Sequence, residues 1–315
     1  MLSPVNNQTK ITEILLLGFQ NLHGLKILLF ILFLLIYITS LTGNLLIITL
    51  VSTQTQLHTP MYLFICLLSL FETMSTTNIA PNMLAVQVEE GRKMPFSSCL
   101  SQFYIFSALT NAECFLLTVM SYDRYLAICN PLRYTSIMNI TFCLHLMIWP
   151  CFLGFMITLV ILLSVLGTLQ FCGPNTINHF FCDLAPLLGI SCSDTFLVEM
   201  LALIFSVPVI IFPFIFITVT YVLIAFTIIG ISSPTGRKKA FSTCSSHLSV
   251  VCTYYGTLIS VYLVPSKGHS LKVNRVVSLL YIVGTPLLNP IVYSMRNQEI
   301  RAAFYRLFFK RQQMY

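Results

Sequence analysis

Long apolar segments constrain the fold of this chain more than any other feature of its sequence. Seven of them are long enough to cross about 30 Å of hydrocarbon as α-helices. Only 9% of the residues are charged and 57% are hydrophobic, whereas a soluble domain carries about 25% charged residues. We therefore predict an all-α membrane protein, a seven-transmembrane helix bundle. The predicted spans are residues 25–51, 58–81, 98–122, 141–166, 196–229, 238–264 and 272–294.

The predicted spans divide the chain into three regions. Residues 1–24 precede the first span and have no basic region of the kind that begins a cleavable signal peptide. Residues 25–294 hold the seven spans, and residues 295–315 form a tail. Apolar residues recur in the tail every three or four positions, which predicts a short amphipathic cytoplasmic helix on the lipid surface; a solvated tail is the alternative. The apolar stripe is Ile300, Ala303, Phe304, Leu307 and Phe308.

The basic residues predict which side of the membrane each loop occupies. An odd number of spans places the two ends of the chain on opposite faces. With the N-terminus outside, more lysines and arginines fall on the cytoplasmic side, and they cluster at helix ends as the positive-inside rule expects. Asn7 begins a glycosylation sequon, Asn7-Gln8-Thr9, which fits an extracellular N-terminus. The net charge of +7 is spread over these boundaries, so no nucleic acid is expected as a partner.

Two acidic residues lie inside predicted spans, where charge is costly and therefore indicates function. Glu72 and Glu113 should lie near the middle of the membrane, with Asn44 and Asn289 at a similar depth. Two carboxylates and neutral oxygens could hold a cation. A protonated, hydrogen-bonded network that packs the bundle explains the same residues equally well.

Residues at the two ends of the third predicted span indicate the two membrane surfaces. The helix from Cys99 to Arg124 would be about 37 Å long, enough to cross the bilayer. Cys99 then lies at the outer surface, and the pair Asp123 and Arg124 lies at the inner one. The outer loop of residues 167–195 holds three more cysteines, and four thiols allow three disulfide connectivities that spacing does not distinguish.

Prolines interrupt the predicted fifth and seventh spans. Prolines in membrane helices kink them and free backbone carbonyl groups, so these spans are expected to be broken. The sequence TPLLNPIVY places Asn289 directly before Pro290 and Tyr293 about one turn later, which predicts a switching element at the cytoplasmic end. The prolines concerned are Pro208, Pro213, Pro286 and Pro290.

No motif supports catalysis. The sequence lacks HExxH, GxSxG and a phosphate-binding glycine loop, so the chain is not expected to be an enzyme.

Six motifs, in order and at matching intervals, resemble the rhodopsin-like G-protein-coupled receptors, and within them the vertebrate olfactory receptors of the tetrapod-type class. The resemblance covers nearly the whole chain. It implies a multi-pass receptor of the plasma membrane that binds a small-molecule odorant and activates a heterotrimeric G protein with an olfactory, stimulatory α-subunit, which raises cAMP. The motifs are LTGNLLI (41–47), LHTPMYLF (57–64), MSYDRYLAIC (120–129), HFFCDLAPLL (179–188), RKKAFSTCSSHL (237–248) and PLLNPIVYSMRN (286–297).

The resemblance also implies roles for individual residues. It implies disulfides between Cys99 and Cys182 and between Cys172 and Cys192. It favours a sodium site at Glu72 and Glu113, although Glu72 replaces the usual aspartate; no other cofactor is expected. The residues implied to form the cytoplasmic switch are Asp123, Arg124, Tyr221, Asn289, Pro290 and Tyr293. In this switch we expect Asp123 to hold Arg124 at rest.

The implied odorant cavity lies in the outer half of the bundle, between the third, fifth, sixth and seventh spans. Phe106 stands where amine receptors carry an aspartate, and Val283 stands where opsins carry the retinal lysine. The matching residues are mostly apolar, which favours a small, mostly neutral, partly hydrophobic ligand. They are Phe106, Ser107, Thr110, Asn111, Phe205, Ser206, Val209, Leu258, Ile259, Tyr262, Ser278 and Ile282.

Two other functions remain as alternatives. An ion-coupled transporter or channel could use Glu72 and Glu113 as its ion site, although the inverted repeats and broken half-helices of such proteins are not visible in the sequence. The same receptor fold could instead sense a metabolite outside the nose.

Overall fold

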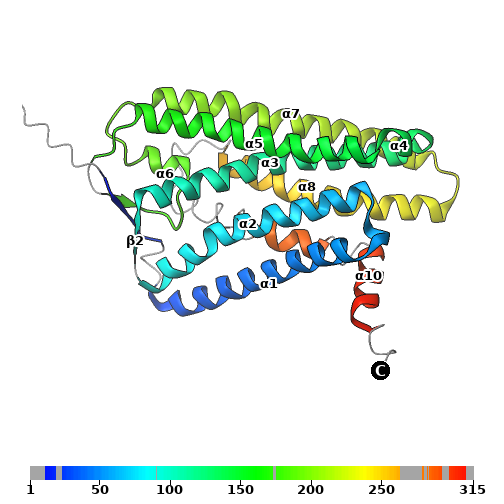
Figure 1. Ribbon diagram of the computed structural model, residues 1–315, viewed down its shortest axis with the longest axis horizontal. Coiled ribbons are helices and arrows are strands. Elements are labelled where there is room, and N and C mark those ends of the chain that lie inside the picture. The colour runs from blue at the N-terminus through cyan, green and yellow to red at the C-terminus, as the bar shows by residue number, and fades with distance from the viewer. Residues whose placement is uncertain are drawn as a thin grey trace, which may run out of the picture.

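Long helices run side by side in the computed structural model of the chain (Figure 1). The structure describes residues 11–18, 23–89, 91–172, 175–262, 279, 282, 284–292 and 298–309. Within these ranges, five helices are long and apolar enough to cross a membrane. They are α1 (Lys26–Thr53), α2 (Pro60–Glu89), α3 (Phe96–Cys129), α5 (Ile140–Thr168) and α7 (Phe196–Ile229).

The sixth and seventh predicted spans are also helical where the structure describes them. Helix α8 (Pro234–Tyr262) covers most of the sixth span, and residues 284–292 form helix within the seventh. The predicted boundaries are too short for the second and third spans, because α2 continues to Glu89 and α3 to Cys129. Helical hydrogen bonding does not stop where the hydrocarbon ends, so hydropathy underestimates these lengths.

The expectation that prolines break the fifth span is wrong. Helix α7 is continuous, with Pro208 and Pro213 inside it. Residues 284–292 are also helical through Pro286 and Pro290. Proline is tolerated in a membrane helix when neighbouring groups and small local adjustments satisfy the freed carbonyl.

The distribution of side chains is that of a protein surrounded by lipid. Large apolar residues point outward, such as Ile27 on α1 and Phe212 on α7, which are 75% and 68% exposed. Polar residues lie inside instead, among them Asn44, Glu72 and His247. In hydrocarbon, polar groups gain by bonding to one another inside a bundle.

Helix α3 lies at the centre of the bundle. It packs against α2, α4 (Pro131–Ile137), α5, α7 and α8. It approaches α5 closely at Gly154, where an added Cβ would lie 2.6 Å from the Ala108 carbonyl oxygen and 2.7 Å from the Ala112 nitrogen. Small residues allow two membrane helices to approach in this way.

A small sheet, which the all-α prediction missed, lies at one end of the bundle. Strand β1 (Glu13–Leu16) pairs antiparallel with β2 (Arg92–Pro95) and parallel with β3 (Thr176–Ile177), in the order β2-β1-β3. The short helix α6 (Leu184–Leu188) lies at the same end (Figure 1). Two 3₁₀ turns, His23–Leu25 and Thr55–Leu57, flank α1.

Both disulfides implied by the family resemblance are present. Cys99 in the first turn of α3 bonds to Cys182, with Cα atoms 5.4 Å apart. Cys172 bonds to Cys192 within the long loop, with Cα atoms 5.8 Å apart. The loop is therefore fastened both to α3 and to itself.

The opposite end of the bundle carries α4 and the tail helix α10 (Gln298–Phe309) (Figure 1). Ile300 and Ala303 are buried against the bundle, whereas Arg301 and Tyr305 are exposed. Helix α10 therefore has the two faces that the apolar stripe predicts.

We predict that Gly154→Ala destabilises the receptor, because the added Cβ would overlap backbone atoms of α3 that cannot move without shifting the helix. Overpacking of this kind costs about 1–3 kcal/mol, so the midpoint of thermal unfolding of the purified protein should fall by about 2–4 °C per kcal/mol. Gly167→Ala on the same helix is the control, since nothing lies within 4 Å of its added Cβ. Equal midpoints for the two variants would contradict the prediction.

Candidate functional site

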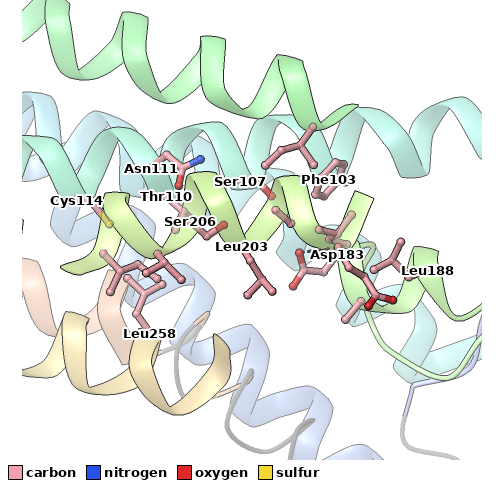
Figure 2. Close-up of a pocket in the computed structure, with 17 residues that line it drawn as sticks. Phe103, Ser107, Thr110, Asn111, Cys114, Asp183, Leu188, Leu203, Ser206 and Leu258 are labelled. Atoms are coloured by element: carbon pink, nitrogen blue, oxygen red, sulfur yellow. Dashed lines mark hydrogen bonds between the residues drawn. The ribbon is translucent and has the colours of Figure 1, made fainter. Parts of the chain in front are cut away.

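A cavity of about 370 Å³ lies between α3, α5, α6, α7 and α8 (Figure 2). Its walls are mainly apolar, with a few hydroxyl, amide and carboxylate groups. The lining residues are Phe103, Ser107, Thr110, Asn111, Cys114, Ile161, Asp183, Leu184, Ala185, Leu188, Glu199, Ala202, Leu203, Ser206, Val207, Ile210 and Leu258.

Helical spacing places these residues on common faces. On α3 the lining positions run from Phe103 to Cys114 and are three or four residues apart, except for the adjacent Thr110 and Asn111, a pattern that covers one side of a helix. Figure 2 shows Cys114 and Leu258 toward one end of the cavity and Asp183 and Leu188 toward the other. The cavity is therefore elongated along α3.

The structure brings some of the predicted ligand residues to this cavity and leaves others away from it. Those that line it are Ser107, Thr110, Asn111, Ser206 and Leu258. Those that do not line it are Phe106, Phe205, Val209, Ile259 and Ile282. Phe106 packs against Phe181 instead, with ring centroids 5.4 Å apart. The side chain of Tyr262, and the whole of Ser278, lie outside the described residues.

Sequence reasoning missed the residues at the end of the cavity nearer the Cys99–Cys182 disulfide. Asp183, Leu184, Ala185 and Leu188 come from the long loop and its helix α6, and Glu199 comes from the first turn of α7. A signal for the loop residues was present, because Asp183 directly follows a cysteine whose implied disulfide fixes it beside α3.

Gln102 holds this loop over the cavity. Its side-chain oxygen accepts a hydrogen bond of 2.9 Å from the Cys182 backbone nitrogen. Its side-chain nitrogen donates to the Asn78 carbonyl at 2.8 Å, and the Asn78 amide donates to the Gln102 carbonyl at 3.0 Å. Gln102, only 3% exposed, therefore joins the loop, α3 and α2.

The acidic residues of the second and third spans are buried, with Glu72 2% and Glu113 4% exposed. The Asn289 amide donates a hydrogen bond to Glu72 Oε1. Asn44 donates to the Pro286 carbonyl at 3.2 Å, and its own Oδ1 is buried with no partner among the described residues. Such an oxygen fits either a cation or a protonated carboxyl group, so both interpretations of Glu72 and Glu113 stay predictions.

The acid–base pair lies near the C-terminal end of α3. Asp123 is fully buried and forms an ion pair with Arg124, whose Nε lies 2.9 Å from Oδ2. The Tyr134 hydroxyl on α4 donates to Asp123 Oδ1 at 2.8 Å. Burial, and then the Asp123 carboxylate, raise the pKa of Tyr134, so this hydroxyl keeps its proton and remains a donor.

In this structure the Tyr221 hydroxyl is hydrogen-bonded to a residue other than Arg124. Its hydroxyl shares a hydrogen bond with His247 Nδ1, which joins α7 to α8. Both side chains are buried. Asn289 and Pro290 lie in the helical residues 284–292, and Tyr293 lies outside the described residues.

Comparison with known proteins finds similarity over nearly the whole chain. Residues 33–311 match the family model described as olfactory receptor. The chain is 46% identical to mouse Olfactory receptor 5G26 over 96% of its own length and 95% of that protein. It is 45% identical to human Olfactory receptor 11L1, over 96% and 93% of the two chains, and 43% identical to human Olfactory receptor 6N1, over 95% of each.

We predict that Gln102→Leu lowers the stability and the surface level of the protein. The change leaves the buried Cys182 nitrogen and Asn78 carbonyl without their partner, and each unsatisfied group costs about 1–3 kcal/mol. Thermal unfolding of the purified protein and antibody labelling of intact cells measure the two effects. Ser101→Ala is the control, because that exposed hydroxyl bonds to the carbonyl of Ser97, one turn earlier on its own helix; an equal loss there would contradict the prediction.

Proposed function

Because the chain belongs to the olfactory receptor family, we propose that its cavity binds a small, mostly neutral, partly hydrophobic odorant and that binding activates a stimulatory G protein of the olfactory type, which raises cAMP. The family assignment makes the chain an odorant receptor of the G-protein-coupled class, with a seven-helix bundle in the membrane, and not an enzyme.

The cavity is the observation that carries this proposal. Its volume of about 370 Å³ is within the range of small-molecule sites, which are mostly apolar with a few placed polar groups. The hydroxyls of Ser107 and Ser206 and the amide of Asn111 supply such groups. The Asn111 amide donates to Thr158 Oγ1 at 3.0 Å, which fixes its orientation in the wall.

The proposal places the cavity on the extracellular side of the plasma membrane. The two disulfides lie at the cavity's end of the bundle, and disulfides form in oxidising compartments. The opposite end carries basic residues on α4, α8 and α10, namely Arg133, Arg237, Arg301 and Arg306. Helix α10, with its buried apolar face and exposed Arg301, would lie against the anionic lipids of the inner leaflet. Asn7, the candidate glycosylation site, lies outside the described residues.

The acid–base pair supports a mechanism of activation. At rest, Asp123 and Tyr134 hold Arg124 against α3 and α4, and His247 holds Tyr221 against α8. A ligand that fits the active arrangement better shifts a pre-existing equilibrium toward it. The cytoplasmic end of α8 then moves outward, Tyr221 leaves His247, and Arg124 becomes available to the α-subunit of the G protein. Tyr221 and Tyr293 would support Arg124 in that state.

The two alternative functions are an ion-coupled transporter and a metabolite receptor, and the structure bears on them differently. An ion-coupled transporter typically carries helices broken near the middle of the membrane, whereas each of the five described spans is continuous. A metabolite receptor would use the same cavity and the same switch, so a panel of odorants and metabolites on the expressed receptor separates that alternative.

We predict that Ala202→Trp weakens the response to odorants. Ala202 lines the cavity on α7, and an indole there would occupy the space that the ligand needs. The half-maximal concentration of any active odorant should rise at least tenfold, the equivalent of about 1.4 kcal/mol, in a cAMP assay on cells. Val219→Trp is the control, because Val219 lies on the same helix but is 52% exposed and faces outward. Equal responses from the two variants would exclude this cavity as the odorant site.

We predict opposite effects from two changes at the inner end. Arg124→Ala should reduce odorant-stimulated cAMP to the basal level at equal surface expression, because it removes the group that receives the G protein. Tyr134→Phe should raise basal cAMP about tenfold, since a hydrogen bond to a charged group contributes about 1.5–3 kcal/mol to the resting state and about 1.4 kcal/mol is a factor of ten. Ser136→Ala, on the exposed side of α4, controls for the second change. Full signalling by Arg124→Ala would contradict this mechanism.

A further inference from the structure

A second cavity, of about 290 Å³, lies between α1 and the tail helix α10. Helix α10 is at the end of α1 that leads into α2 (Figure 1). None of the residues of this cavity lines the candidate odorant cavity. We call it the tail groove, and its lining residues are Gly43, Leu46, Ile47 and Leu50 on α1 and Ile300, Arg301, Phe304 and Tyr305 on α10.

The walls of the tail groove are almost entirely apolar. Its α1 side runs from Gly43 to Leu50 along one face of the helix, a length of about 10 Å. Leu50 and Ile300 are each 1% exposed, so they form its floor. Water in such a space would find too few polar partners, and an empty space would forfeit dispersion contacts. The walls therefore favour a flexible hydrocarbon chain as the occupant.

The tail groove opens to the surface of the bundle. Leu46 and Phe304 are partly exposed, and Tyr305 is 56% exposed. Leu45, the neighbour of Leu46 on α1, is 45% exposed and points outward, as expected of a side chain that meets lipid. A hydrocarbon chain can therefore enter the groove from the surrounding membrane without passing through the protein.

Arg301 is the charged residue among those that line the tail groove. It is exposed, and it makes no hydrogen bond or ion pair within the part of the chain that the structure describes. Glu299, the acid nearest to it in the sequence, is two residues earlier on α10, and residues with this spacing do not face each other on a helix. An arginine at the edge of an apolar groove can lay its stem along the apolar surface and keep its guanidinium group at the level of the lipid headgroups.

We propose that the tail groove binds one anionic phospholipid of the cytoplasmic leaflet, with an acyl chain between α1 and α10 and the phosphate group on Arg301. This inference goes beyond odorant binding, and it rests on the proposed orientation, in which α10 lies at the cytoplasmic face. Anionic lipids are concentrated in that leaflet. A guanidinium group can donate two parallel hydrogen bonds to one phosphate, which fixes the headgroup as well as attracting it.

The position of the groove gives the lipid a structural effect. The acyl chain would contact both α1 and α10, so it fastens the tail helix to the bundle. Gly43, at one end of the groove, is also the point where α1 meets the seventh predicted span, because an added Cβ there would lie 2.8 Å from Pro290 Cβ. The bound lipid therefore packs beside the segment that carries Asn289 and Pro290.

A tryptophan at the edge of the groove reports binding. Trp149, the single tryptophan of the chain, is replaced by Trp149→Phe, and Tyr305→Trp supplies the reporter. The purified full chain, in micelles of an uncharged detergent, is titrated with phosphatidylserine or phosphatidylcholine whose acyl chains carry bromine, which quenches a nearby indole. Phosphatidylserine should reach half-maximal quenching at a concentration about fivefold lower, the preference expected of one arginine near a lipid surface. Equal concentrations for the two lipids would overturn the proposal.

A charge-removing variant tests the headgroup site in the same assay. Arg301→Gln should bring the half-quenching concentrations of the two lipids close to equality. Arg133→Gln is the matched control, because it removes an exposed arginine of α4 at the same end of the bundle and outside the groove. If Arg301→Gln reduces the preference for phosphatidylserine no more than Arg133→Gln does, the headgroup site is wrong.

A space-filling variant tests the acyl-chain site. Leu46→Phe narrows the groove and should raise the half-quenching concentrations of both lipids about fivefold, the lower end of the cost of overpacking. Leu45→Phe, on the outward side of α1, is the control and should leave them unchanged. Equal values for the two variants would overturn the groove as the acyl-chain site. Arg301→Gln alters an exposed side chain, so it tests the proposal even if Leu46→Phe does not fold.

Two competitors distinguish other occupants. Glycerophosphoserine has the headgroup of phosphatidylserine without its acyl chains, and it should not relieve the quenching; relief equal to that by unbrominated phosphatidylserine would overturn the proposal. Cholesterol that relieves the quenching at a lower concentration than phosphatidylserine would show that the groove binds a sterol instead. The assay uses neither odorant nor G protein, so its failure leaves the proposed function intact, and a receptor without any cAMP response could still bind the lipid.

Discussion

Hydrocarbon offers no hydrogen-bond partners, so every polar group in the spans must find one inside the chain. This constraint accounts for the long helices, which satisfy their own backbone groups. It also accounts for the contacts between helices. Asn44 bonds to the backbone of the seventh predicted span at Pro286, and Asn289 of that span bonds to Glu72 on α2. The polar residues inside this bundle therefore fasten helices together as well as serving any site that they form.

The same constraint explains which parts of the fold could be predicted from the sequence. Apolar length and helical spacing located the five described spans and α10 because both depend on local sequence alone. The sheet was missed because β3 has two residues and β1 has four, too few to show a pattern, and because its pairing depends on segments far apart in the chain. The continuity of α7 through Pro208 and Pro213 was missed for a related reason, since the cost of a proline depends on the neighbours that satisfy the freed carbonyl.

The candidate site also contains residues that could be predicted from the sequence and residues that were missed. Ser107, Thr110 and Asn111 could be predicted because they lie on one face of one helix in a family-matched segment. Asp183 was missed because its position depends on how a disulfide and Gln102 fold the long loop back over α3, although the cysteine before it was a signal. The hydrogen bond from Tyr134 to Asp123 joins α4 to α3 across a turn. Neither the spacing nor the types of these residues predicts it. Contacts between elements that are separate in the sequence could not be predicted, whereas local patterns could.

The geometry of α8 indicates how the two ends of the receptor could communicate. Leu258 of α8 lines the cavity, and the hydroxyls of Tyr254 and Tyr255 donate to backbone carbonyls of α3, at Thr110 and Cys114, beside its inner end. About two turns further along the same helix, His247 binds Tyr221. A ligand that contacts Leu258 therefore acts on α8, the same helix whose His247 makes the contact with Tyr221. Helix α3 is continuous from Phe103 to Arg124 and packed on several sides, so the proposed mechanism moves α8 rather than α3. A ligand can shift this equilibrium only by its difference in affinity for the two positions of α8, so the residues that contact both the ligand and α8 decide how strongly an odorant activates the receptor.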